Sequence, residues 1–148
     1  MPGPVDRFNR AAKLVLALAQ DEAFRRFHRG FIGPEHVLLA LIREHESVAA
    51  QVLRSFGVDI VSARQTLEAI SGRGDPQQEF AEIVLSPGTR KIIELASEEA
   101  KGLGAETVAP EHVLLAIVRE PGSAEAILRG LGVPLAAIRQ KVLETLGR

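Results

Sequence analysis

The chain has 148 residues, the size of one ordinary domain, and its 46% of apolar residues is enough to form a buried core. Its net charge of −1 provides no basic face for a phosphate backbone, so nucleic acid is not an expected partner. The absence of cysteine excludes disulfides, thiolate metal sites and cysteine nucleophiles, and it fits a reducing cytoplasm.

The sequence contains no signal for a membrane. No apolar run approaches the roughly 20 residues that a membrane-spanning helix needs. The start, Met1–Pro4, has no basic stretch followed by an apolar one, so it does not resemble a secretory signal. We therefore expect a cytoplasmic protein with no membrane partner.

An internal repeat organises the chain. Pro34–Ala40 recurs unchanged as Pro110–Ala116, and weaker matches extend in both directions. The offset between the copies changes from 77 to 76 to 75 residues, and we expect these one-residue differences to lie in loops. The sequence thus predicts a single domain over 1–148, with repeat one at 7–73, a linker at 74–84 and repeat two at 85–148.

Each repeat is predicted to contain four helices. The first begins near Asn9 and again near Ser86, because both residues are good N-caps. The second begins at Pro34 and Pro110, because proline is favoured at the first helical position.

The third and fourth helices are predicted from the same signals, which are polar residues at helix starts, apolar spacing and glycine at helix ends. The third helix follows Ser47 and Ser123 and stops at Gly57 and Gly132. The fourth helix runs from about Asp59 to Ser71, and from Pro134 to Leu146.

The predicted fold class is all-α. No segment shows the period-2 alternation of a half-buried strand. The apolar stripes are too wide to be covered within one repeat, so we expect two tandem four-helix repeats, about eight helices in all, packed with pseudo-two-fold symmetry.

No catalytic or metal-binding motif is present. The chain has no phosphate-binding P-loop, no H-E-x-x-H and no G-x-S-x-G sequence. His28, His36, His45 and His112 are not spaced as metal ligands. We expect His36 and His112 to form local bonds at helix starts, and we expect neither a metal ion nor a cofactor.

The candidate binding residues occur in equivalent pairs. Glu35 and Glu111 each occupy the second position of a helix, where the macrodipole alone can account for a carboxylate. The N-caps Asn9 and Ser86 each have a cation four residues later. Each N-cap and its cation, Lys13 or Arg90, suggest an oxyanion or phosphate site in each repeat. If the glutamate of the same repeat lies beside that site, a ligand with both an anionic and a cationic group could bind to the two together.

These residues resemble a known family. The segments Arg7–Ala11, Leu16–Ala23 and Ile32–Leu39, followed by Arg43–Glu44, are similar to the N-terminal repeat domain of Clp-family AAA+ unfoldases, especially the ClpC branch. The similarity extends over nearly the whole chain and includes both copies.

The resemblance implies eight helices in two pseudo-symmetric halves and a non-catalytic module that delivers substrates and adaptor proteins to an ATPase ring. It also implies that each half can bind phosphoarginine. By position, Glu35 and Glu111 would hold the guanidinium, and Asn9 and Ser86 would lie on the phosphate side. Lys13 and Arg90 are added from the repeat symmetry alone.

The chain departs from the family pattern at two places. Pro34 and Pro110 stand where the family usually has threonine before the Glu-His pair, and Asn9 stands where it tends to have threonine. The alternatives to a recruiting domain are a stand-alone regulator that competes with the unfoldase's own N-domain and, from another class, a small hydrolase on a helical scaffold.

Overall fold

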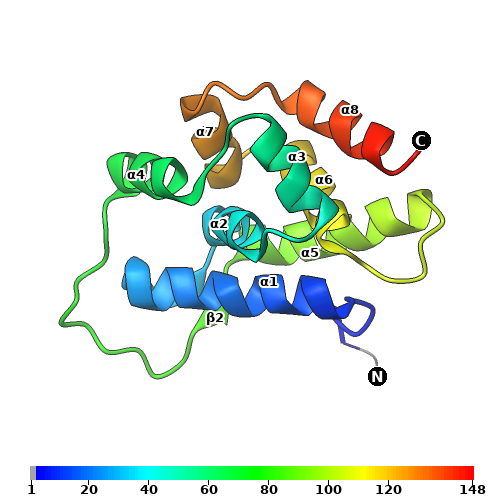
Figure 1. Cartoon of the computed structure of the whole chain (residues 1–148). Coiled ribbons are helices and arrows are strands. Elements are labelled where there is room, and N and C mark those ends of the chain that lie inside the picture. Colours follow the sequence, from blue (N-terminus) through cyan, green and yellow to red (C-terminus); the bar gives the residue numbers. More distant parts are fainter. Residues whose placement is uncertain (1–2) are drawn as a thin grey trace.

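The computed structural model describes residues 3–148, and helices dominate that part of the chain (Figure 1). A short π-helical turn, η1, spans Glu22–Arg26, and two-residue strands β1 and β2 span Phe31–Ile32 and Val84–Leu85. The α-helices in the described residues are α1 Arg10–Asp21, α2 Pro34–Glu44, α3 Val48–Ser55, α4 Ile60–Ser71, α5 Pro87–Gly102, α6 Pro110–Arg119, α7 Ser123–Gly130 and α8 Leu135–Thr145.

The predicted all-α class and the predicted helix starts are confirmed with one exception. The side chains of Asn9 and Ser86 cap α1 and α5 by accepting N–H bonds from the first turn. Ser47 caps α3 in the same way. Ser123, in contrast, is the first residue of α7, whose N-cap is Gly122, so this helix begins one residue earlier than predicted.

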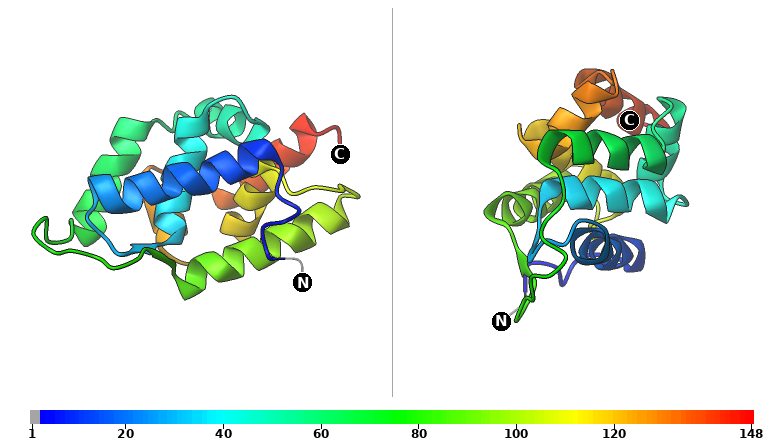
Figure 2. Two further views of the ribbon diagram at one scale, coloured as in Figure 1. Left: turned by 90° about the horizontal axis from the view of Figure 1, so that it is seen from below. Right: turned by 90° about the vertical axis from the view of Figure 1, so that its left-hand side faces the viewer.

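The two repeats pack around a central pair, α2 and α6, with pseudo-two-fold symmetry. Within the repeats, α1 lies along α2 and α5 lies along α6. Between the repeats, α2 contacts α7 as α6 contacts α3, and α4 contacts α7 as α8 contacts α3. Figure 2 shows α1 and α5 flanking the central helices on one side of the molecule. Each repeat therefore buries its apolar stripe against the other, as the width of the stripes predicted.

Short parallel pairings join the repeats just before their helices. Phe31 pairs with Val84 and Ile32 with Leu85, directly ahead of α2 and α5. An isolated bridge, Phe8 with Val108, stands ahead of α1 and α6. These pairings are too short to produce an alternating pattern, which is why the sequence did not reveal them.

The first length difference between the repeats lies inside a helix end rather than in a loop. In repeat one, the Arg29 N–H donates to the Ala23 carbonyl at 2.8 Å, six residues back. In repeat two, the Ala105 N–H reaches the Ala100 carbonyl at 2.9 Å, five residues back. A single inserted residue is commonly absorbed by a π-turn, and η1 occupies this segment of repeat one. The expectation that both differences lie in loops is therefore wrong here.

Each repeat also contains one buried carboxylate held by arginines. Glu22 has no exposed area, and its Oε1 lies 2.5 Å from Nη2 of Arg64 on α4. The equivalent Glu99 is 7% exposed and lies 2.6 Å from Nη1 of Arg139 on α8. These ion pairs tie the end of the first helix of each repeat to the fourth helix of the same repeat.

Candidate functional site

The candidate residues meet across the repeats, not within them. The Ser86 N–H donates to the Ile32 carbonyl at 3.0 Å, which places the start of α5 beside the start of α2. Ser86 and Glu35 consequently line the same cavity. The sequence left open whether each N-cap lies beside the glutamate of its own repeat. Ser86 lies instead beside Glu35 of the other repeat, because the parallel pairing of β1 with β2 joins the repeats at their helix starts.

The start of α5 is fastened tightly to the start of α2. Thr89 is fully buried, and its hydroxyl donates to the Ile32 carbonyl at 2.8 Å. Gly88 leaves room for the ring of Pro34, whose Cγ would lie 3.1 Å from a Cβ at that position. The sequence analysis missed both residues, because their roles exist only when α2 and α5 adjoin.

The Glu35 site is a cavity of about 340 Å³ between the two helix starts and the α6–α7 turn. The Ser123 hydroxyl donates to Glu35 Oε1 at 2.9 Å across this cavity. Glu120 and the ring of Phe31 complete its rim. The cavity is thus assembled from both repeats, and its volume suits a small ligand or a single side chain.

Buried histidines stabilise the starts of α2 and α6. His36 Nδ1 accepts the Gly33 N–H at 2.9 Å, and His112 Nδ1 accepts the Ala109 N–H at 2.9 Å. This confirms the predicted local bonding. Burial lowers the pKa of both imidazoles, and the neighbouring carboxylates, chiefly Glu35 and Glu111, offset the shift only in part. Neutral rings are required, because a protonated Nδ1 cannot accept the backbone N–H.

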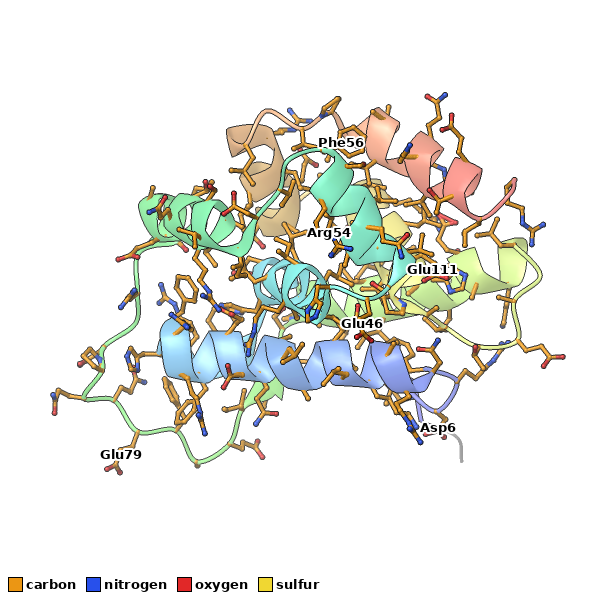
Figure 3. The ribbon with its side chains drawn as sticks, in the orientation of Figure 1. Asp6, Glu46, Arg54, Phe56, Glu79 and Glu111 are labelled. Carbon is orange, nitrogen blue, oxygen red and sulfur yellow. The ribbon has the colours of Figure 1, made fainter. Side chains whose placement is uncertain are left out.

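The Glu111 site is the pseudo-symmetric counterpart. The Asn9 N–H donates to the Val108 carbonyl at 2.9 Å, so the start of α1 lies beside the start of α6. Glu111 is half-buried at the second position of α6. In the view of Figure 3 its label stands between α3 and α1.

The two predicted cations are exposed, whereas the two glutamates are half-buried. Lys13 is exposed on α1, and Arg90 is exposed on α5. Arg90 lines a separate groove of about 800 Å³ that runs along α5 to Lys101. It does not line the cavity that holds Glu35 and Ser86.

Two further searches concern only residues 3–148. Within that range, no group of three or more His, Asp or Glu side chains gathers so as to hold a metal ion. No helix in that range is long and apolar enough to cross a membrane.

Comparison with known sequences identifies the repeat. The family model described as the Clp repeat (R) N-terminal domain matches residues 7–131. ClpC/MecB of Bacillus subtilis, named a negative regulator of genetic competence, is 43% identical over 143 residues. A ClpA homologue of Porphyra purpurea, named an ATP-binding subunit of the ATP-dependent Clp protease, is 41% identical over 143 residues.

These relatives are much longer than the chain. The alignments cover 95% and 96% of the chain but 17% of each relative. Among solved structures, the N-terminal domain of the chaperone ClpD from Arabidopsis thaliana matches with a TM-score of 0.79 at 24% identity, covering 97% of each chain. That likeness shows the fold, and the sequence match shows the family: the chain belongs to the Clp repeat N-terminal domain family.

Proposed function

We propose that this domain is a non-catalytic recognition module that recruits substrate or adaptor proteins to a Clp ATPase. We further propose that it has two sites for a phosphorylated arginine side chain, Glu35 with Ser86 and Glu111 with Asn9. The observation that carries the proposal is the meeting of helix starts from different repeats, which puts a carboxylate beside a capped helix N-terminus twice.

The chemistry of each site matches the two halves of such a ligand. A guanidinium donates parallel N–H bonds to a carboxylate, and Glu35 is half-buried, so solvent screens such bonds less than at a fully exposed site. A phosphoryl group is favoured at a helix N-terminus, where free backbone N–H groups and the macrodipole attract an anion. The Ser86 hydroxyl lies at the N-terminus of α5 and lines the Glu35 cavity.

The departures from the family pattern are compatible with these sites. Pro34 and Pro110 supply neither a hydroxyl nor an N–H, but in this fold they occupy the first position of α2 and α6. The phosphate-side groups come instead from the starts of α5 and α1 in the opposite repeat. The ligand would therefore bridge the repeats, and binding would stabilise the packing between them.

Isothermal titration calorimetry with free phosphoarginine tests the proposal directly. We expect the wild-type domain to bind two equivalents, Glu35→Ala and Glu111→Ala each to lose one, and the double variant to lose both. Arginine and inorganic phosphate serve as ligand controls. Glu79→Ala removes an exposed carboxylate that does not line the Glu35 cavity and that lies well away from Glu111 in Figure 3, and it serves as the variant control.

Unchanged affinity in the double variant would assign both glutamates to helix-end electrostatics alone. Capture of an arginine-phosphorylated protein by the wild-type domain, and its loss in the double variant, would connect these sites to recruitment. Lys13→Ala and Arg90→Ala show whether the exposed cations assist the phosphate. The position of Arg90 in the neighbouring groove predicts a small effect.

A further inference from the structure

We propose that Ser123 is a positioning residue for Glu35 and that it makes the Glu35 site the more preorganised and tighter of the two. This inference rests on the proposed function and deepens it. It concerns why two sites built from equivalent helix starts should differ in affinity.

The direct observation is the hydrogen bond between the repeats. Ser123 Oγ donates to Glu35 Oε1 at 2.9 Å, and both side chains are half-buried. A glutamate at a helix start normally samples several rotamers, and a ligand must restrict them on binding. Ser123 donates to Oε1 alone, so among the described residues Oε2 has no hydrogen-bond donor and can accept from a ligand's N–H group.

The second length difference between the repeats explains why this hydroxyl is available. In repeat one, the hydroxyl of Ser47 caps α3 by accepting the Ala50 N–H at 3.1 Å. Repeat two has one residue fewer at this point, so Ser123 moves from the capping position to the first position of α7. Its hydroxyl is then not used as a cap and bonds to Glu35 instead.

Gly33 provides the space for this arrangement. The Glu35 side chain folds back over the backbone of Gly33, and a Cβ at that position would overlap with its carboxylate. Repeat two has Ala109 at the equivalent N-cap of α6. The methyl group of Ala109 therefore denies Glu111 the conformation that Glu35 adopts.

The surrounding charge favours the cationic half of the ligand. Glu120 lines the cavity together with Glu35, and no basic side chain is among the described residues that line it. The equivalent Glu44 is instead committed to the backbone, since its Oε2 accepts the Ser47 N–H at 3.0 Å. The Glu35 site consequently presents two carboxylates to a guanidinium.

The test measures each site separately with phosphoarginine as the probe. The Glu111→Ala background reports on the Glu35 site, and the Glu35→Ala background reports on the Glu111 site. We expect Ser123→Ala to raise Kd about three- to ten-fold in the first background and to leave it unchanged in the second. Ser123→Thr keeps a hydroxyl and should restore most of the affinity.

A Kd at the Glu35 site that is unchanged by Ser123→Ala would overturn the positioning role and leave the proposed function intact. Absence of phosphoarginine binding by the wild-type domain would overturn the proposed function. In that case the folded-back conformation of Glu35 can still be tested by stability measurements. Gly33→Ala should lower Tm by about 2–10 °C only while Glu35 is present, and Ala109→Gly is the matched control. An equal loss in the Glu35→Ala background would refute the folded-back carboxylate.

Discussion

Removal of the Arg64 side chain should destabilise the domain strongly, because it strips the main partner from a fully buried carboxylate. Glu22 Oε1 lies 2.5 Å from Arg64 Nη2, and both carboxylate oxygens lie 3.2 Å from Arg64 Nε. The only other cation on Glu22 among the described residues is Arg43, 3.3 Å away, which is shared with Asp21 at 2.7 Å.

The magnitude follows from the burial of Glu22. Removing one partner of a buried ion pair costs about 3–5 kcal/mol, because the remaining charge is left without compensation. Arg43 stays in contact, so we expect the lower end, about 3 kcal/mol, for Arg64→Ala. For a domain of this size that corresponds to a Tm lower by about 6–12 °C.

Urea and thermal denaturation, monitored by circular dichroism, provide the assay. The matched control is Arg73, which lies just beyond the end of α4. Arg73 lies 3.4 Å from Glu68, and the two side chains are 54% and 50% exposed. Solvent screens such a pair, so Arg73→Ala should cost less than about 0.5 kcal/mol. Equal losses for Arg64→Ala and Arg73→Ala would refute the claim that Glu22 depends on Arg64. A double-mutant cycle with Glu22→Gln would then show no coupling.

Three further outcomes are expected. Ser47→Ala should lower the free energy of unfolding by about 1 kcal/mol through loss of the α3 cap, whereas Ser123→Ala removes no cap and should lower it only through loss of its bond to Glu35; denaturant melts compare them. The low pKa of buried His36 and His112 means that the unfolded chain binds more protons below about pH 6.5, so stability is complete above that pH and falls on acidification towards pH 5. Replacing both histidines with glutamine should flatten this dependence, and an unchanged pH profile would contradict it. Gly30→Ala should destabilise the domain, because a Cβ there would overlap with the Phe80 ring; an unchanged melting temperature would show that Phe80 moves aside without cost.

The helices and the pseudo-symmetry could be predicted because their causes are local or repeated. Asn9, Ser47 and Ser86 cap helices through their own first turns, and Pro34 and Pro110 mark helix starts by their fixed φ. These signals act over three or four residues, so they can be read without knowledge of the partner repeat.

The site could be predicted only in part. Glu35 and Glu111, and likewise Asn9 and Ser86, could be picked out because they stand at equivalent helix starts in the two copies; their role in binding stays a prediction. The sequence could not decide which helix starts adjoin, since that depends on two short parallel pairings with no sequence signature. The third helix was predicted to follow Ser123 because sequence alignment places it opposite Ser47, although α7 begins at Ser123 itself.

The sequence by itself determined that this protein is a duplicated helical unit with one candidate carboxylate per copy, because capping, proline and apolar period are encoded residue by residue. Only the tertiary structure decided which helix starts meet. It also decided that Glu35 is held by Ser123 across 88 residues and that Glu22 is buried against Arg64. Those contacts arise when two repeats with uncovered apolar stripes pack together, and a one-residue shift at a helix start is enough to free a hydroxyl for a new partner.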